Sequence, residues 1–567
     1  MNSYLINIIH KSRWLEKKEY LILLMLFCGA IAFRLVLMIN TYAVGFDEVN
    51  YLKLAADARL NGIKYVLHPY WPPFLPIIVA LFSYIIPNFE IAGRFSSILI
   101  NAVLIFPCYV FVKKHIDRRT AYLVASLVAF YSMYAGYSVH VETEAIYTML
   151  AISGIFLGWS ALNQRKPVKS FLVGILFGGA YLTRPEGIGF LIVFIGLTFL
   201  IALCHFIKKS NYRSYVPVML FVLVGFTITA FPYLNYLRKE TGGWTLSAKG
   251  LSNQLGEMYL RKKAIDEPHP FHVLRDNNTR LIEDEIYHIG NFIANMKHET
   301  QLQNRVSFLA ILKKIGWQNY QIITKEFLKV FSLPTLIIIV LGLFSVPWSR
   351  KNVLVDGYLL SYLLFFWFLL IPSFHITIRY FIPLVPIAFI WLVKGGFQMH
   401  NWLKVTLANI TEIHWTSGLL SKLSAVIVII VICGGAILPD FAKHMKRSID
   451  SIEEWSPAIE QKKAGIWLKR NGVKSPIVMA YNHAVSFYAG NFKIAESVEI
   501  PKNEAGPLIE YAKHRKVNYI VLNTRYQHRH PLISHLYQGR EIPIELKQIY
   551  YDRERNGLET RIYKVLN

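Results

Sequence analysis

The chain has 567 residues, of which 54% are hydrophobic, 14% aromatic and only 17% charged, and its mean hydropathy is positive. This composition indicates an integral membrane protein and excludes an ordinary soluble one. The formal net charge of +25 arises from short basic runs between apolar segments. Membrane topology explains such runs, and a nucleic-acid partner is not expected.

Apolar runs along the chain predict about eleven transmembrane helices, since about twenty apolar residues cross a bilayer. They lie at about residues 20–40, 91–112, 118–136, 144–162, 169–184, 186–206, 215–236, 327–347, 353–373, 377–395 and 420–438. The first run lacks a small-residue cleavage site after it, so we expect an uncleaved helix. The run Phe74–Ile86 has only about thirteen residues and follows Trp71-Pro72-Pro73, which predicts an interfacial or re-entrant helix.

Basic clusters between the predicted spans indicate the orientation of the chain. They lie near residues 113–119, 165–169, 208–213, 350–351 and 394–404. If the run 74–86 does not cross, all of them fall on the side of the basic N-terminus, as the positive-inside rule requires. If it crosses, they face outward. We therefore predict a cytoplasmic N-terminus. The tail lacks cysteines, which favours a prokaryotic plasma (inner) membrane, although an endoplasmic reticulum membrane with the lumen as the outside would show the same topology.

Two larger pieces are predicted on the outer side, beyond an outer loop at 41–90 that carries the interfacial helix. Residues 237–326 form a polar, mostly helical loop long enough to cover a site as a lid. In residues 440–567, helix-like and strand-like stretches alternate. The predicted fold is an α-helical polytopic membrane domain, residues 1–439, followed by a small extracytoplasmic α/β domain, residues 440–567.

An acidic pair, Asp47 and Glu48, directly follows the first span. Carboxylates are costly near hydrocarbon, so the pair marks a candidate reaction site. With the orientation fixed, further ionisable and aromatic residues fall on the same outer face. They are His68, Arg94, Glu142, Glu144, Arg184, Glu186, Arg379 and Tyr380.

Ordinary structural roles compete with these functional interpretations. Asp47 and Glu48 could be a solvated pair at a helix end, and Glu142 or Glu144 could favour the start of a helix through its dipole. Arg184 could hold phosphate oxygens or be a snorkelling anchor.

The remaining candidates have the same ambiguity. Glu186 fits an ordinary helix start after Pro185. His68 and Tyr380 could line a site or belong to interfacial aromatic clusters. Arg379 enters a helix interrupted by prolines, and Arg94 at the outer end of a span is costly unless it is paired or neutralises a lipid phosphate.

The order of these parts resembles the polytopic GT-C glycosyltransferases. The parts are an acidic pair after the first helix, a His/Pro-Pro run, an acidic residue in the second outer loop, a Thr-Arg-Pro turn and a late Arg-Tyr pair with prolines. Within that superfamily the chain is similar to the bacterial branch related to dolichyl-phosphate-mannose protein mannosyltransferases and lipid A aminoarabinose transferases. The likeness spans about residues 20–395.

The resemblance implies roles for individual residues. The family's catalytic acid matches Asp47, with Glu48 beside it, and the second-loop acid matches Glu144 or, alternatively, Glu142. Here Trp71 precedes the two prolines where relatives often carry His, so His68 is displaced.

Arg184, and Arg379 with Tyr380, match positions that contact donor phosphate or shape the cavity. The family implies a polyprenyl-phosphate sugar as donor and a glycan, lipid or protein as acceptor. The sequence holds no Gly-rich phosphate loop or Rossmann fingerprint, which argues against a soluble nucleotide donor.

The expected mechanism is an inverting transfer in which Asp47 accepts a proton from the acceptor. Arg184 or Arg379, with Arg94 or a divalent metal ion held by nearby carboxylates, would stabilise the departing phosphate. A transporter or flippase of lipid-linked saccharides is the main alternative, although transporters place charges at mid-membrane depth. A scaffold whose outer domain binds carbohydrate is a second one.

Overall fold

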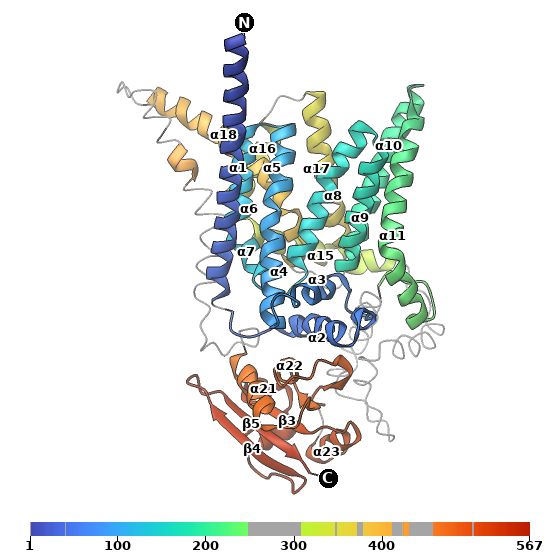
Figure 1. The fold of residues 1–567 in the computed structure, drawn as a ribbon, viewed down its shortest axis with the longest axis vertical. Coiled ribbons are helices and arrows are strands. Elements are labelled where there is room, and N and C mark those ends of the chain that lie inside the picture. Colours follow the sequence, from blue (N-terminus) through green and yellow to red (C-terminus); the bar gives the residue numbers. More distant parts are fainter. Residues whose placement is uncertain are drawn as a thin grey trace.

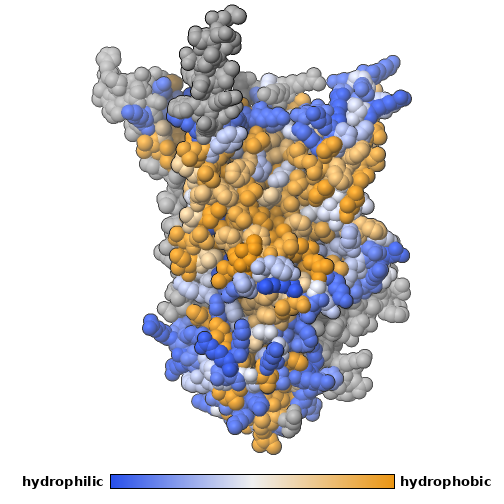
Figure 2. All heavy atoms as spheres, in the orientation of Figure 1, coloured by the Kyte–Doolittle hydropathy of each residue, from blue (hydrophilic) through white to orange (hydrophobic). Residues whose placement is uncertain are grey.

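The structure is a computed structural model that describes residues 2–39, 41–247, 308–345, 349–370, 378–410, 422, 425–429, 458–501 and 504–566. The structure has three parts in space (Figure 1). A helical bundle forms the largest part, two short helices lie across one of its ends, and a small sheet domain lies beyond those helices. Figure 2 shows an apolar band around the bundle between two hydrophilic ends. Exposed side chains such as Leu24 and Phe368 suit contact with lipid tails, so the protein is an integral membrane protein.

The bundle is built from helices of very different lengths. In chain order they are α1 (Asn2–Met38), α4 (Phe89–Val103), α5 (Ile105–His115), α6 (Arg118–Phe130), α7 (Ser132–Ser138), α8 (Glu144–Gln164), α9 (Pro167–Thr183), α10 (Ile188–Ile207), α11 (Val216–Thr241), α15 (Phe308–Val330), α16 (Leu333–Phe344), α17 (Arg350–Leu370) and α18 (Val385–Ile410). Short 3-10 turns include η1 (Ile63–Val66), η2 (Pro185–Gly187), η5 (Ile378–Tyr380) and η6 (Ile382–Leu384).

Among the described residues, seven helices are long and apolar enough to cross a membrane, or eight if one bent pair counts as a span. The sequence predicts about eleven by the same length rule. Four of the predicted spans are not found as single long helices in the described part of the chain, for the following reasons. Helix α9 has only 17 residues, the predicted span at 118–136 is broken into α6 and α7 at Tyr131, and the one at 327–347 bends by 92° between α15 and α16. The predicted span at 420–438 lies mostly outside the described residues.

The break between α6 and α7 is stabilised by Arg34 of α1. Its buried guanidinium donates to Asn101 Oδ1, to the carbonyl of Ala129 at 2.6 Å and to that of Val128 at 3.2 Å. A helix that ends inside a membrane leaves carbonyls without intrahelical partners, and water cannot satisfy them there. Arg34 therefore has a structural role, which explains a guanidinium deep in the first span.

The turns of the bundle separate basic from acidic groups. The turns between α5 and α6, α8 and α9, and α10 and α11 carry the predicted basic clusters at one end, near the N-terminus (Figure 1). The opposite end carries the acidic pair and the start of α8. Helix α3 (Phe74–Phe82) has nine residues and lies across this second end (Figure 1), so the prediction of a non-crossing helix there is confirmed. Helix α2 (Phe46–Asn61) beside it was not predicted.

The sheet domain has five strands in the order β2-β1-β3-β5-β4. Strand β1 (Val478–Ala480) pairs in parallel with β2 (Ser497–Val498) and β3 (Tyr519–Asn523), whereas β5 (Glu559–Val565) pairs antiparallel with β3 and β4 (Leu546–Arg553). The helices of this domain are α21 (Ile459–Asn471), α22 (Ala484–Tyr488), α23 (Ala505–His514) and α24 (Ser534–Tyr537).

Alternate residues of β3 face opposite layers of helices. Tyr519 and Val521 pack with α21, whereas Ile520 and Leu522 pack with α23 and α24, as the period of two along a strand requires. The small α/β domain predicted from the sequence is thereby confirmed. Most of the predicted outer loop at 237–326, proposed as a lid, lies outside the described residues, although α11 and α15 extend into its two ends.

A shared apolar core joins the sheet domain to the bundle. Leu52 of α2, Leu75 of α3 and Val141 before α8 pack in one cluster with Phe487 and Tyr488 of α22. Removing such side chains from water is the main favourable term in packing elements together. The sheet domain is therefore docked onto α2 and α3 rather than tethered loosely to them.

A close crossing of α16 and α18 gives the first prediction. A Cβ at Gly342 would lie 1.7 Å from the carbonyl oxygen of Trp391, whereas a Cβ at Gly357 of α17 would meet nothing within 4 Å. We expect Gly342→Ala to destabilise the protein by about 1–3 kcal/mol or more, since overpacking forces backbone shifts. Thermal unfolding in detergent measures this, with Gly357→Ala as the control. Equal unfolding temperatures for the two variants would contradict the crossing.

Candidate active site

Asp47 and Glu48 occupy the first turn of α2, where the positive end of the helix dipole favours carboxylates. Consecutive residues of a helix point in different directions. Asp47 is 34% exposed and places Oδ2 3.6 Å from Nη1 of Arg379. Glu48 is buried and accepts a hydrogen bond from Nδ1 of His140 at 2.6 Å. The acidic pair is thus divided between an accessible carboxylate and an inaccessible one.

Arg379 of η5 faces three carboxylates from different parts of the chain. Its Nε donates to Glu144 Oε1, its Nη2 lies 3.4 Å from Glu142 Oε2, and its Nη1 faces Asp47. Glu144 is the first residue of α8, and its side chain is 1% exposed. We call Asp47, Glu142, Glu144, Arg184 and Arg379 the charged cluster.

Arg184 is the second cation of the cluster. It lies between α9 and η2, where Pro185 ends one helix and starts the next turn. Its Nη1 donates to Glu144 Oε1 at 2.8 Å, and its Nε is 3.7 Å from Glu186 Oε2. The guanidinium also lies 5.1 Å from the centre of the Tyr380 ring, within the range of a cation–π contact.

The charged cluster combines an accessible carboxylate with two guanidinium groups that are held in place. Asp47 is exposed enough to reach a substrate, whereas both guanidinium groups share one oxygen of Glu144. The other oxygen, Glu144 Oε2, is buried and has no hydrogen-bond partner within the described part of the chain. Glu144 therefore holds both guanidinium groups through a single oxygen.

Arg94 and His68 make their hydrogen bonds outside the charged cluster. Arg94 pairs with Glu90 at 2.9 Å and donates to backbone carbonyls before α2. His68 is folded into its own turn, where Nδ1 accepts from the backbone N–H groups of Tyr70 and Trp71 at 3.1 and 3.2 Å. Burial lowers the pKa of His68 to about 4, so its ring is neutral at pH 7. Their predicted roles in donor binding and cavity lining remain predictions.

His140 is a residue of this region that the sequence reasoning did not select. Its ring bonds Glu48, and although burial alone would raise the pKa of Glu48, the ring holds that pKa below its usual value. The only signal was position, because His140 stands two residues before Glu142 in the same outer turn. Its effect on Glu48 depends on α2, which the sequence did not predict as a helix.

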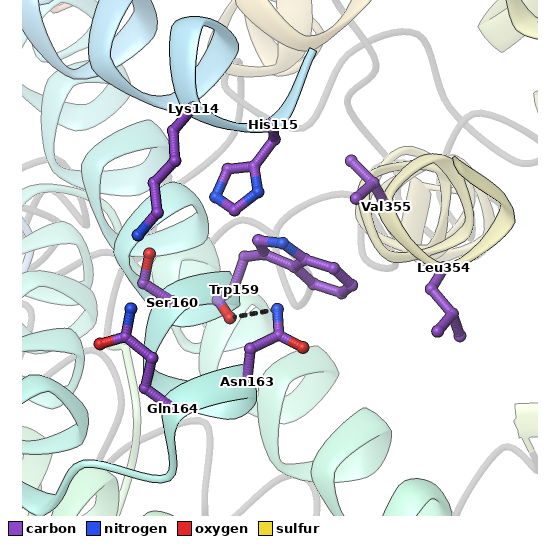
Figure 3. Close-up of a pocket in the computed structure, with 8 residues that line it drawn as sticks. All are labelled: Lys114, His115, Trp159, Ser160, Asn163, Gln164, Leu354 and Val355. Atoms are coloured by element: carbon purple, nitrogen blue, oxygen red, sulfur yellow. Dashed lines mark hydrogen bonds between the residues drawn. The ribbon is translucent and has the colours of Figure 1, made fainter. Parts of the chain in front are cut away.

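A cavity of about 550 Å³ lies at the opposite end of the bundle and takes no part in the cluster. Figure 3 shows Lys114, Ser160 and Gln164 along one side, with Trp159 and Val355 toward the other. All of these residues come from the basic ends of α5 and α8 or from the start of α17. The charged cluster is therefore built at the other boundary of the apolar band.

The predicted metal ion finds no obvious site in the part of the chain that the structure describes. Within it, no group of three or more His, Cys, Asp or Glu side chains is arranged to hold a metal ion. Glu142 and Glu144 both face Arg379. Arginine thus provides the positive charge in the described cluster.

Comparisons with known proteins agree with this architecture. Residues 68–230 match the family described as dolichyl-phosphate-mannose-protein mannosyltransferase, whereas no curated protein matches the chain in sequence. The fold is similar to that of archaeal oligosaccharyltransferase AglB from Archaeoglobus fulgidus, in complex with an inhibitory peptide and a dolichol-phosphate. The TM-score is 0.60, with 12% identity over 96% of this chain and 74% of that chain.

A second similar structure is ArnT from Cupriavidus metallidurans in the apo state. Its TM-score is 0.51, with 10% identity and coverage of 98% of both chains. Both proteins are GT-C glycosyltransferases, so the resemblance inferred from the sequence is confirmed at the level of the fold.

The burial of Glu142 predicts a pH-dependent stability. Burial raises its pKa to about 7, an effect that Arg379 opposes and Glu144 reinforces. A carboxyl whose pKa is raised by folding contributes stability at low pH and loses it as pH rises through the folded value. We expect Glu142→Gln to stabilise the protein by roughly 1–3 kcal/mol at pH 8 and hardly at all near pH 4.5. Thermal unfolding at the two pH values measures this, and an equal shift at both would contradict the prediction.

Proposed function

We propose that the protein is a glycosyltransferase that moves a sugar from a polyprenyl-phosphate donor to an acceptor on the outer face of the membrane. The observation that carries this proposal is the accessible carboxylate of Asp47 beside Arg379, at the start of α2, which lies across one end of the bundle (Figure 1). A base and a cation that adjoin lipid suit a reaction whose leaving group remains anchored in the membrane. The GT-C fold shared with AglB and ArnT supports the same class of reaction.

The two guanidinium groups supply the chemistry that a lipid phosphate requires. Arg379 lies 3.4 and 3.6 Å from Glu142 and Asp47, contacts longer than its bond to Glu144, so its Nη atoms are able to exchange partners. Phosphate oxygens bind guanidinium groups well because both form paired, charge-assisted hydrogen bonds. The AglB structure contains a dolichol-phosphate, which is a lipid phosphate of the proposed kind.

The proposed transfer is a direct displacement with inversion. The acceptor O–H or N–H proton passes to Asp47 as the acceptor atom bonds to the anomeric carbon. The bond from that carbon to the phosphate oxygen breaks, and charge grows on the leaving lipid phosphate. In this proposal Arg379 and Arg184 stabilise that charge, and Glu144, which bonds both of them, keeps the two guanidinium groups in place.

The alternative of a transporter fits the arrangement less well. Transporters place ionisable groups near mid-membrane depth, between repeats that move against each other. Here the charged cluster lies at one end of the bundle, and Arg34 of α1 is bonded to the carbonyls at a helix break. An enzyme that works at one face explains both observations.

Loss of the base is the direct test of this proposal. We expect Asp47→Asn to reduce sugar transfer at least about 100-fold, because general base catalysis contributes roughly 10²–10⁴. The assay incubates purified protein in lipid vesicles with radiolabelled polyprenyl-phosphate sugars and a membrane extract as acceptor. Asp57→Asn is the matched control, since Asp57 lies on the same helix and bonds only Asn61 among the described contacts.

The assay also separates the enzyme from the transporter. Transfer by wild type and by Asp57→Asn, together with its loss in a folded Asp47→Asn protein, supports the enzyme. Label that crosses the bilayer equally in all three proteins, without reaching any acceptor, contradicts it.

The proposed orientation has its own prediction. Lys547 on β4 and Lys208 at the end of α10 are both exposed, but they lie at opposite ends of the molecule (Figure 1). In a variant without native cysteines, we expect Lys547→Cys to react with a membrane-impermeant maleimide in intact cells. If the protein lies in an inner membrane, the outer membrane is first permeabilised so that the reagent can reach it. Lys208→Cys should react only after lysis. The reverse pattern would invert the topology and place the charged cluster in the cytoplasm.

A further inference from the structure

The segment at 41–45, which leads from α1 into α2, is held by side chains from distant elements. Arg94 of α4 donates to the backbone carbonyl of Thr41 and, at 3.1 Å, to that of Ala43. The guanidinium is buried, so these bonds form out of contact with water. The backbone just before the acidic pair is therefore fixed from the side of the bundle.

The sheet domain fixes the same segment from the other side. Lys462 of α21 donates to the carbonyl of Tyr42 at 3.0 Å. The hydroxyl of Tyr488, at the end of α22, accepts from the backbone N–H of Val44 at 3.0 Å. One carbonyl and one N–H group of this short segment are thus bonded by residues more than 400 positions away in the sequence.

One carboxylate, that of Glu90, connects these three side chains. It lies 2.9 Å from Arg94 Nη2 and 3.0 Å from Lys462 Nζ, and it accepts from the Tyr488 hydroxyl at 3.0 Å. Glu90 is buried, and a buried network of charges is costly to break because each lost partner leaves another group unpaired. Glu90 therefore couples the bundle, the sheet domain and the segment before α2.

A second attachment lies further along α2. Lys53 is fully buried, and its Nζ donates to Ser486 Oγ at 2.7 Å and to Ser497 Oγ, both in the sheet domain. Lys53 is six residues after Asp47, which is less than two helical turns. The start of α2 is thus held at two points by the sheet domain.

We propose that the sheet domain positions the catalytic carboxylate, with Glu90, Lys462 and Tyr488 as positioning residues. This proposal rests on the proposed function of Asp47. The contact between Asp47 and Arg379 depends on where α2 begins and how it is rotated. A displacement of about 1 Å at a reacting group can lower a rate by about 100-fold, so the network controls turnover without touching substrate.

Two adjacent lysines on α21 provide a matched test. Lys462 reaches across to Glu90 and the segment before α2, whereas Lys463 pairs with Glu554 inside the sheet domain. We expect Lys462→Met to lower kcat for sugar transfer at least about tenfold, with the KM for the polyprenyl-phosphate sugar changed less than about twofold. Lys463→Met should leave both unchanged. Lys462→Arg, which restores a cation and donors, should recover most of the lost kcat.

Hydrogen exchange gives a readout that does not depend on activity. Amides in the segment 41–46 should exchange at least about fivefold faster in Lys462→Met than in Lys463→Met. The same increase is expected in Tyr488→Phe, which removes only the hydroxyl bonded to Val44. Thermal unfolding verifies that each variant is folded. Unchanged exchange in both variants overturns the proposal, as does faster exchange with an unaltered kcat.

The two proposals fail in different ways. If the wild type transfers sugar from no lipid-phosphate donor, the proposed function is wrong, and the positioning of a catalytic Asp47 is overturned with it. Faster exchange at 41–46 in Lys462→Met would then show that the network still holds the segment. If the wild type is active and Lys462→Met has both a normal kcat and normal exchange, only the positioning role is refuted.

Discussion

The structure depends on one buried carboxylate at the edge of the apolar band. Glu144 begins α8, and its Oε1 receives hydrogen bonds from Arg184 and Arg379, which belong to turns far along the chain. Removing one partner from a buried ion pair costs about 3–5 kcal/mol, because it leaves an uncompensated charge. The outer ends of α8, α9 and α18 are therefore brought together by electrostatics that lipid and apolar packing cannot replace.

This constraint also determines what is left for chemistry. Because Glu144 already neutralises part of both guanidinium groups, Arg379 contacts Asp47 and Glu142 only at 3.6 and 3.4 Å. An anion that enters can replace these weaker contacts at a small cost, whereas the Glu144 contacts keep both arginines in place. The two guanidinium groups are thus held in place by Glu144, while the longer contacts of Arg379 with Asp47 and Glu142 can be exchanged for an anion. A departing phosphate requires such an arrangement.

Much of the fold followed from patterns in the sequence, whereas the site followed only in part. Apolar run lengths gave most of the long helices, and alternating stretches gave strands such as β3 (Tyr519–Asn523). The orientation inferred from the basic turns stays a prediction. Helix α2 was missed because it is neither apolar nor amphipathic in a simple way, and it is stable through packing against α3 and the sheet domain. Contacts such as Glu90 to Lys462 join residues 372 positions apart, and no local pattern predicts which charges will meet.

The two acids of the pair show what the structure adds to the family resemblance from which Asp47 was selected. In the sequence Asp47 and Glu48 are equivalent neighbours, but a rotation of about 100° per residue sends them in different directions from α2. Glu48 fits only the buried position where His140 meets it at 2.6 Å, since a buried charge needs a partner. Fixing Glu48 there fixes the rotation of the helix, and with it the direction of Asp47 toward Arg379. In the proposed reaction the second acid would therefore act through the first, by setting the direction of the exposed carboxylate.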